Sequence, residues 1–586
     1  MGTMHTISRP ALARNWNRRR SDGYDVVVIG SGYGGAITAA RLATAQWLRT
    51  KPSICVLERG KEWLPGQFPD QLGSAAHEVR SPINPLGLYD FQFGTDIGVL
   101  RGCGLGGTSL INANVAIQPD NEVFDELQWP QAVRDARNSG LLQQYFARVK
   151  KTLDAGPHPN ATQLSKAKAI QQGVRGVAGA DFAPVDIAVN FQFEQTNNTW
   201  SVPQRRCINC GDCVTGCNVG AKNTLDVNYL AIAKHGGADL FTQIEVQHVQ
   251  RDTGGGFLVH YRRRESSSSQ PEEGTLQAKQ LVVLAAGALG STEILLRSRE
   301  QGLSLADTLG SRLSGNGDFF GVAYNSDLRA DVLGWGAYPD SDRAQRLQPQ
   351  PGPTPFPGPT IVSRVKYNTN RPLGERITVE DTSIPLLYVD TARSVFSWVL
   401  GRDTDRGDFL EELSRRGRDV GAFDPRLEGG ALNHTLLYLV MGRDDAAGRI
   451  DLHPVTNAAR IRWPGVGGQG VFERANQLIL DHATALGATF VENPLWRFTL
   501  FQTLLTVHPL GGCPMGEDAT TGLVNDLGQI FDRSGNLHEG LYVADGSIIP
   551  TALNVNPFLT ISALAERIAD NLVTKLGGTP AIIASI

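Results

Sequence analysis

The chain has 586 residues, 41% of them hydrophobic, and its 55 Lys and Arg against 59 Asp and Glu leave a formal net charge of -4. That length is too great for one compact core, so two or three structural units are expected. The mild acidic balance argues against nucleic acid as a partner, and no window reaches the ~20 consecutive apolar residues of a membrane span. No hydrophobic signal region precedes the first predicted strand, so a cytoplasmic protein is expected.

The first motif along the chain is a glycine-rich turn. Residues 26–29 are an apolar run that predicts a strand buried on both faces, and a helix is expected to follow. Between them, Gly30, Gly32 and Gly35 fit the G-x-G-x-x-G spacing of dinucleotide sites, and Gly34 lies in the same turn. Such glycines allow a tight turn, close approach of a pyrophosphate and close packing of the helix, whose N-terminus favours phosphate. The motif therefore predicts a nucleotide cradle.

Later segments extend the same unit. A second apolar strand, residues 54–57, ends at Glu58, which stands 23 residues after Gly35, where a carboxylate could hold a ribose 2′-OH. A strand, a turn of small residues and an amphipathic helix recur at 280–296, after a predicted hairpin. Another strand ends at Asp545 and Gly546. These separated pieces predict an α/β domain that is assembled from several parts of the chain.

The pattern changes between about residues 311 and 500. A Pro-rich stretch at 348–360 is interpreted as a rigid surface loop, with a polyproline-type ligand of a partner as the alternative. An apolar strand is predicted at 435–441. This part of the chain is therefore expected to form a second, sheet-containing domain.

Four of the seven cysteines crowd into one short segment, with the spacing C-x2-C-x2-C-x3-C: Cys207, Cys210, Cys213 and Cys217. Bacterial ferredoxins use this spacing for iron-sulfur ligands, and in those with two clusters the last cysteine serves the other cluster. Whether Cys217 completes the site is therefore open, and both 4Fe-4S and 3Fe-4S centres are considered. A zinc site and unmetallated thiols are the alternatives, whereas disulfides are disfavoured in the expected compartment.

Six segments together carry a family likeness: GSGYGG at 30–35, GCGLGGTSLINANV at 102–115, GAKNTL at 220–225, AGALGSTE at 286–293, HPLGGC at 508–513 and VNPF at 555–558. In order and wording they resemble the glucose-methanol-choline (GMC) family of FAD oxidoreductases, and within it the cholesterol oxidase-like branch. The resemblance implies FAD and a hydride transfer from an alcohol carbon to flavin N5. It also implies an α/β fold, in which a Rossmann-like FAD-binding domain of the p-hydroxybenzoate hydroxylase type carries an inserted α+β substrate domain built on an antiparallel sheet.

The resemblance also implies domain limits and site residues. We expect a flexible arm at 1–20, the FAD-binding domain at 21–310 and again at 501–586, and the substrate domain at 311–500, with residues 130–225 partly substrate domain and cysteine insertion. The catalytic pair is expected to be His508, as the base that accepts the hydroxyl proton, and Asn556, which orients the hydroxyl. Further expected cofactor contacts are Gly104, Gly106, Gly107, Asn112, Val246, Asp545, Gly546, Asn556 and Pro557.

Two departures from the family pattern affect the function. Cholesterol oxidases that also isomerise the steroid carry a glutamate shortly before a Leu-Tyr-Leu strand, where this chain has Leu432, Asn433 and His434, with Glu428 as the nearest carboxylate. Isomerase activity and a sterol substrate are therefore doubtful, and His434 is interpreted as a structural residue or a substitute base. The second departure is the cysteine segment, since a cluster beside the flavin would pass electrons singly to an external acceptor.

The expected function is an FAD-dependent oxidoreductase acting on a bulky, apolar alcohol, with a redox protein or a quinone as possible electron acceptor. Two rival hypotheses are a sugar or polyol dehydrogenase, and an electron-transfer flavoprotein without an organic substrate of its own.

Overall fold

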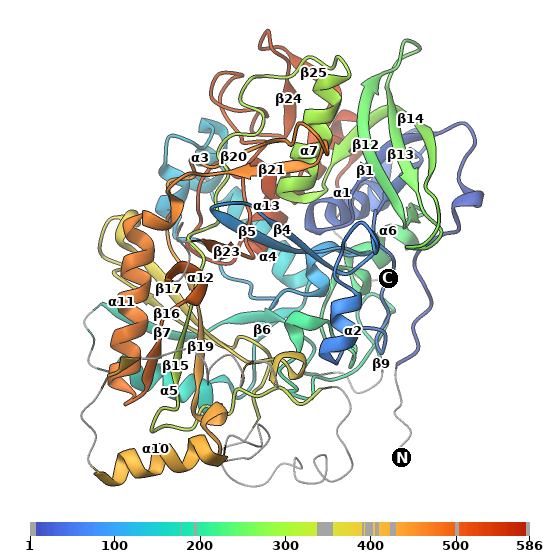
Figure 1. Cartoon of the computed structure of the whole chain (residues 1–586). Helices are drawn as coiled ribbons and strands as arrows, with labels where there is room; N and C mark the ends of the chain where they lie inside the picture. Colours follow the sequence, from blue (N-terminus) through green and yellow to red (C-terminus); the bar gives the residue numbers. More distant parts are fainter. Residues whose placement is uncertain are drawn as a thin grey trace.

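The computed structural model describes residues 7–581 apart from 176, 178, 193–195, 337–355, 390–391, 393–401, 405–408, 422–428 and 498–502. Its described part contains two large sheets, one of eight strands and one of seven, together with smaller sheets of two or three strands (Figure 1). None of the helices in these ranges is both long and apolar enough to cross a membrane.

The eight-stranded sheet is built on strands that the sequence predicts. β3 (Ile54–Leu57), β1 (Tyr24–Ile29), β14 (Glu272–Leu284) and β25 (Leu537–Val543) lie side by side and parallel. The Val, Leu and Ile side chains toward their carboxyl ends are buried on both faces, as is typical of parallel strands. The predicted hairpin is confirmed as the antiparallel pair of β13 (Phe257–Arg263) and β14. The remaining strands are β11 (Asp239–Phe241), β12 (Ile244–Arg251) and β24 (Gln529–Phe531).

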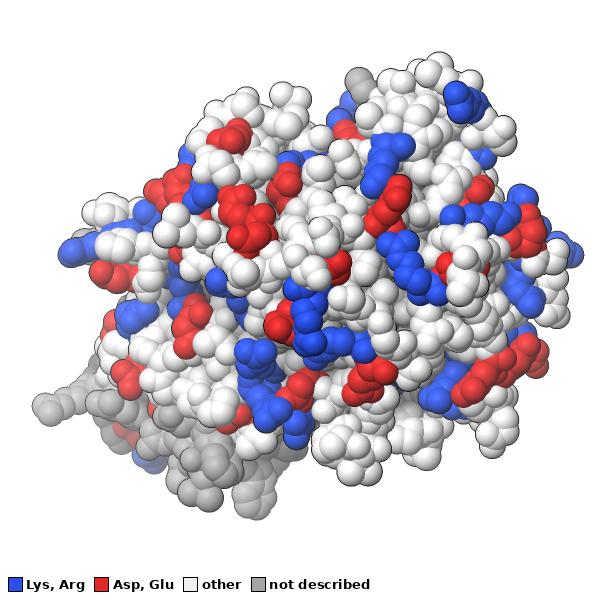
Figure 2. Space-filling model, turned by 90° about the horizontal axis from the view of Figure 1, so that it is seen from above, with Lys and Arg blue, Asp and Glu red and all other residues white. Residues whose placement is uncertain are grey.

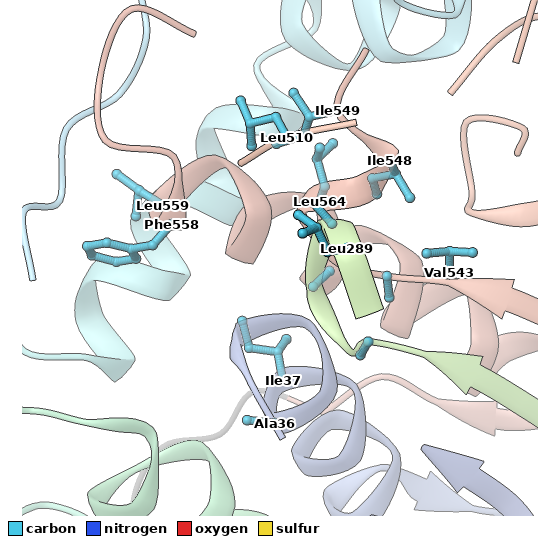
Figure 3. Packing of buried hydrophobic residues seen from close by; sticks show 14 of the residues in the cluster. Ala36, Ile37, Leu289, Leu510, Val543, Ile548, Ile549, Phe558, Leu559 and Leu564 are labelled. Atoms are coloured by element: carbon cyan, nitrogen blue, oxygen red, sulfur yellow. The ribbon is translucent and has the colours of Figure 1, made fainter. Parts of the chain in front are cut away.

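Helices from both ends of the chain cover this sheet. α1 (Tyr33–Thr44) packs against α6 (Tyr229–His235) and α13 (Phe558–Lys575), α4 (Leu141–Thr152) packs on α13, and α7 (Gly287–Glu300) packs on β12. Figure 3 shows the apolar side chains between these elements, among them Ile37 of α1, Leu289 of α7 and Leu564 of α13, which are at most 1% exposed. The domain therefore joins pieces of chain that are far apart in the sequence.

The seven-stranded sheet confirms the expected antiparallel sheet. Its order is β18 (Arg402–Asp403), β22 (Thr489–Val491), β15 (Phe319–Tyr324), β19 (Leu436–Met441), β17 (Ile377–Thr382), β16 (Ser363–Tyr367) and β7 (Ala180–Pro184), and every neighbouring pair is antiparallel. α11 (Gly470–Ala485) and α5 (Ser165–Gly173) pack on this sheet, and α10 (Phe409–Gly421) packs near its end (Figure 1).

Short elements complete the described chain. The helices are α2 (Leu72–His77), α3 (Gln131–Asn138) and α12 (Pro494–Arg497). The strand groups are β4 (Tyr89–Phe93), β5 (Ile97–Gly102) and β23 (Leu504–Thr506); β20 (Arg449–Leu452) and β21 (Ala459–Arg462); β6 (Ala155–Pro157) and β8 (Asp186–Ala188); β2 (Gln46–Trp47) and β26 (Gly578–Thr579); β9 (Thr196–Asn197) and β10 (Pro203–Gln204).

The N-terminal segment differs from the expected flexible arm over residues 7–20. Trp16 is 5% exposed and packs edge-on against the rings of Phe241 and Tyr261. Arg9 is buried as well, and its guanidinium donates to the carbonyl oxygens of Pro203 and Gly220. An aromatic ring and a buried, hydrogen-bonded guanidinium therefore hold this segment against the domain.

On the described surface that Figure 2 shows, Lys and Arg side chains are interspersed with Asp and Glu rather than gathered into a patch of one sign. This arrangement agrees with the absence of a basic field in the composition.

Candidate active site

The predicted cofactor residues meet at one edge of the eight-stranded sheet. β1, β3, β14 and β25 run parallel, so their carboxyl ends lie together, and they are followed by Gly30, Glu58, Ala285 and Ala544. In open α/β sheets, ligands bind at this edge.

The glycines of the first turn have different surroundings. Gly30 has a φ of 99°, and a Cβ there would lie 2.3 Å from the carbonyl oxygen of Ala285, while a Cβ on Gly34 would lie 1.7 Å from that of Ala544. A Cβ on Gly35 would lie 2.0 Å from the carbonyl oxygen of Gly30, which is the close helix packing that the motif predicts. A Cβ on Gly32, by contrast, would meet nothing within 4 Å. Gly32 therefore faces open space at the N-terminus of α1.

Ser31 joins three of the predicted segments. Its hydroxyl donates to Glu58 Oε2 at 2.5 Å and accepts from the backbone N–H of Gly106 at 3.0 Å. Glu58 Oε1 accepts from the N–H of Gly60 at 2.9 Å. The structure thus places Glu58 between the first glycine turn and the loop of Gly104, Gly106 and Gly107, which begins after β5.

Gly107, Asn112 and Val246 lie around the same region. A Cβ on Gly107 would lie 2.9 Å from the Cα of Gly32, so the two glycine turns touch. Asn112 donates through Nδ2 to the Tyr33 hydroxyl at 2.9 Å, whereas its buried Oδ1 has no hydrogen-bond partner. Val246 is 6% exposed and lies on β12. The start of this strand is held next to Glu58, because the N–H of Ile244 donates to the Glu58 carbonyl at 2.8 Å.

The Asp545 carboxylate holds the backbone of two turns. It accepts from the N–H groups of Ser547 and Gly287, both at 2.8 Å, and from the hydroxyl of Ser291 at 2.5 Å. Burial raises the pKa of this carboxyl group. Asp545 therefore fixes Gly546 and the start of α7 at the sheet edge, and the backbone of these turns remains for a ligand.

These observations fit a bound FAD. The N-cap of α1 is Gly32, which offers no side chain to the free N–H groups of the first helical turn, so an anionic phosphate can bind them. The open space at Gly32 and the unpartnered Oδ1 of Asn112 lie in the same region. Gly30, Gly32, Glu58, Gly106 and Gly107 are accordingly the residues that would hold the cofactor.

His508 forms a pair with a buried aspartate that the sequence did not reveal. Its Nδ1 lies 2.8 Å from Asp318 Oδ1, and the Asp318 side chain is fully buried. Asp318 Oδ2 accepts from the N–H of Val507 at 2.9 Å and from the Thr506 hydroxyl at 2.8 Å. Because an ionised carboxylate only accepts hydrogen bonds, Nδ1 carries the proton, and Nε2 of the neutral ring is left as an acceptor.

Asn556 contacts a second unexpected carboxyl group. Its Nδ2 donates to Glu380 Oε2 at 3.1 Å, while Asn556 Oδ1 and Glu380 Oε1 are buried without partners. Burial is the main cause that raises the pKa of Glu380 to about 8; the bond from Asn556 acts against it, and the nearby Asp381 and Asp318 add smaller increases that are included in this value. Glu380 is therefore protonated at neutral pH. Unpartnered polar atoms on both residues are free for a substrate.

One loop positions both predicted catalytic residues. Asn316 precedes Asp318 by two residues, and its Nδ2 donates to the carbonyl of Val555 at 2.9 Å. Its Oδ1 accepts from the N–H groups of Leu553 and Asn554, which hold the turn before Asn556 and Pro557, the N-cap of α13. The loop thus fixes the Asn556 turn through Asn316 and the His508 ring through Asp318.

Other predicted positions lie elsewhere. His434 ends the short helix η8 (Ala431–His434), where its Nδ1 lies 2.9 Å from the carbonyl of Ser326, which supports the structural interpretation. Glu428 and most of the Pro-rich stretch lie outside the described residues. The four clustered cysteines are free thiols, and within the described ranges no three or more His, Cys, Asp or Glu side chains are arranged as a metal site.

The sheet-edge cradle beside the His508–Asp318 pair fits a dinucleotide-dependent oxidoreductase. Models of the GMC oxidoreductase family match residues 24–314, with the N-terminal domain, and residues 480–565, with the C-terminal domain. The chain belongs to the GMC oxidoreductases, a family of FAD-dependent enzymes that oxidise alcohols, as the sequence motifs indicate.

Similar proteins cover nearly the whole chain. A cholesterol oxidase of Acinetobacter baumannii is 26% identical over 94% of this chain and 95% of its own length, and one of Mycobacterium tuberculosis is 28% identical over 93% and 90%. The long-chain-alcohol oxidase FAO4B of Arabidopsis thaliana is 22% identical over 98% of this chain and 72% of its own length. The crystal structure of pyridoxine 4-oxidase from Mesorbium loti shares the fold, with a TM-score of 0.55, 14% identity and coverage of 93% of this chain and 98% of that one.

Proposed function

We propose that the protein oxidises a bulky, apolar alcohol, such as a 3-hydroxysteroid, at the centre formed by His508 and Asn556. The pairing of His508 with the buried Asp318 carries this proposal, because it presents a neutral imidazole Nε2 as a base. FAD held by Gly30, Gly32, Glu58, Gly106 and Gly107 would supply the hydride acceptor that the side chains lack.

The side chains handle the proton and the orientation of the substrate. An alcohol releases hydride readily only as its hydroxyl proton leaves, so a base near that oxygen lowers the barrier. His508 Nε2 accepts this proton, and the ionised Asp318 stabilises the resulting imidazolium. Asn556 contacts the same oxygen, and its bond to Glu380 fixes the orientation of its amide. Asn316 and Asp318 fix the positions of Asn556 and His508 relative to each other.

The relatives support an apolar substrate. Two of them are named as cholesterol oxidases and another as a long-chain-alcohol oxidase, so both kinds of substrate combine one hydroxyl with a large apolar body. A sugar or polyol would instead require a pocket with many hydrogen-bonding groups.

Glu380 favours a second activity, isomerisation of the oxidised steroid. The sequence lacks a glutamate at the position expected for it, yet the fold brings the carboxyl group of Glu380 to Asn556 from another strand, β17. Moving a double bond into conjugation with a new carbonyl requires one group to take a proton from the carbon between them and return it further along. A carboxyl group with a pKa of about 8 could do both steps, and isomerisation should then rise with pH through that value.

The test is an anaerobic absorption measurement on the purified protein with a panel of alcohols that includes a 3-hydroxysterol, a long-chain alcohol and a sugar. Bleaching of the flavin bands by the sterol or the long-chain alcohol supports the proposal, and bleaching by the sugar alone supports the sugar dehydrogenase. If no alcohol bleaches the flavin whereas a reduced redox protein does, the electron-transfer flavoprotein replaces both.

The variant His508→Ala separates binding from chemistry. It should retain FAD and lower the rate of flavin reduction by about 10²- to 10⁴-fold, the usual contribution of a positioned base. An unchanged rate would remove His508 from the mechanism. For the electrons that leave the reduced flavin, the proposal includes a route through an iron-sulfur cluster at the clustered cysteines to an external acceptor.

A further inference from the structure

The four clustered cysteines surround one small cavity. Cys207, Cys210, Cys213 and Cys217 all line it, although their side chains come from different turns of the loop that follows β10. The cavity has a volume of about 30 Å³, larger than the ~10–15 Å³ that one water molecule needs. Thiols are weak hydrogen-bonding groups and bind water weakly. An empty space is also unfavourable, because the atoms that line it lose van der Waals contacts. This space is therefore suited to a ligand that binds through sulfur.

The backbone bends between each pair of successive cysteines. Asn209, Gly211 and Gly216 have φ values of 63°, 84° and 108°, and they separate the four cysteines in turn. Left-handed residues are uncommon, above all when they are not glycine. Their repetition bends the chain around the cavity that all four cysteines line. Because Cys217 lines the same cavity as the other three, a second site is not needed to account for it.

One thiol already accepts a hydrogen bond from the loop. The backbone N–H of Asn209 donates to Cys207 Sγ at 3.4 Å. Hydrogen bonds to sulfur are among the features that set the reduction potential of iron-sulfur clusters.

Positive charge lies beside the cavity. Lys222 lines it and is only 2% exposed, and its ammonium group donates to the backbone carbonyls of Leu110, Asn112 and Cys213 at 3.1, 2.5 and 2.9 Å. A buried cation is costly unless an opposite charge accompanies it. Four thiolates around a cluster carry a net negative charge, which would stabilise this ammonium group.

Lys222 also connects the cavity to the flavin side. Leu110 and Asn112 belong to the segment that follows the second glycine turn, and Asn112 in turn contacts Tyr33 at the start of α1. One side chain therefore spans the wall between the cysteine loop and the expected cofactor site.

We propose that Cys207, Cys210, Cys213 and Cys217 bind a cubane iron-sulfur cluster that passes electrons from reduced FAD to an external one-electron acceptor, a redox protein or a quinone. The inference rests on the proposed function for the flavin half of the reaction. Each alcohol oxidised sends two electrons through the cluster, one at a time. One proton leaves through His508 and one from the reduced flavin; two equivalents of a redox protein take one electron each, or one quinone takes both electrons together with two protons. The enzyme is then a dehydrogenase rather than an oxygen-consuming oxidase.

The first experiment measures iron, acid-labile sulfide, zinc and FAD in the full chain purified without oxygen. About four iron and four sulfide per chain, with a broad visible absorbance that dithionite bleaches, are expected. Stoichiometric zinc, or FAD-loaded protein that holds no metal even after anaerobic incubation with iron and sulfide, overturns the cluster. Flavin bleaching by an alcohol is scored separately, so failure of the cluster and failure of the alcohol oxidation give different results.

Variants then test the ligand set. Cys210→Ser should lose the cluster's iron and slow reoxidation of the flavin by a one-electron acceptor at least tenfold, with its FAD content as the check of folding. Cys55→Ala is the matched control, because Cys55 is a buried free cysteine on β3 away from the cavity, and it should keep the iron. Iron that persists in both Cys210→Ser and Cys217→Ser would overturn the assignment.

Discussion

The substitution Asp318→Asn tests how the protein prepares its base. The two oxygens of Asp318 have separate partners, since Oδ1 faces His508 Nδ1 and Oδ2 accepts from the Val507 N–H and the Thr506 hydroxyl. An asparagine has one acceptor oxygen and one NH2 group. The backbone N–H of Val507 cannot rotate away, so the amide oxygen should occupy the Oδ2 position and the NH2 group should face His508. The imidazole must then accept at Nδ1 and carry its proton on Nε2.

That tautomer cannot accept the hydroxyl proton of the substrate. We therefore expect flavin reduction to slow by about 10²- to 10⁴-fold, the range for loss of a positioned base. At 1.36 kcal/mol for each tenfold change, the barrier rises by about 3–5 kcal/mol. The serine protease in which the equivalent substitution leaves the geometry intact loses about 10⁴ in rate for the same reason.

The assay is stopped-flow reduction of the bound flavin without oxygen, at saturating alcohol. FAD content and thermal unfolding check that the variant is folded. Asp307→Asn is the control, because Asp307 forms an exposed ion pair with Arg533 and should leave the rate unchanged. If Asp318→Asn with full FAD reduces its flavin at the wild-type rate, the tautomer argument is refuted.

Three further changes probe neighbouring groups. The pKa of Glu380 is about 8 in the folded protein and near 4.5 in the unfolded chain, so this group lowers the free energy of unfolding by about 1.4 kcal/mol for each pH unit between those values. The melting temperature of Glu380→Gln should therefore exceed that of wild type by more at pH 8 than at pH 5. Two melting curves that stay parallel across this pH range would contradict the raised pKa. Gly32→Ala should leave the apoprotein as stable as wild type but weaken FAD binding, because the new Cβ enters space that only a cofactor would fill. Gly73→Ala is the control, since its Cβ also meets open space, and it should retain FAD. Equal flavin content in the two variants would count against FAD binding at this turn. Asn316→Ala removes three buried hydrogen bonds, so it should lower both the melting temperature and the rate of flavin reduction. The rate should fall further than in another variant with the same melting temperature. An equal fall in the two variants would show that Asn316 has a structural role only.

Much of the nucleotide-binding half could be predicted because its signals are local. The strands at 26–29 and 54–57 are apolar runs, the glycine spacing lies within six residues, and each of these patterns acts on its own neighbours in the chain. The antiparallel sheet of the second domain followed instead from the family likeness.

The carboxyl groups of the centre could not be predicted in this way. Glu380 lies 176 residues before Asn556, and an acidic residue in a strand is more often exposed than buried beside an amide. Asp318 likewise meets His508 only because β15 continues from the loop that starts at residue 315. Trp16 did carry a signal, since an aromatic residue inside a basic segment has apolar surface to bury, and it explains why residues 7–20 are packed in place.

The pairing of the two ends of the chain has a consequence for biosynthesis. The cradle begins at β1 and α1, but its remaining walls are β25 and α13, which ends at Lys575. Until β25 and α13 have been synthesised, β14 lacks its neighbour on one side and α1 lacks the helix that packs against it, and no complete flavin pocket exists. FAD can therefore bind only after α13 has been made, and the apolar surfaces that await β25 and α13 are exposed to aggregation until then.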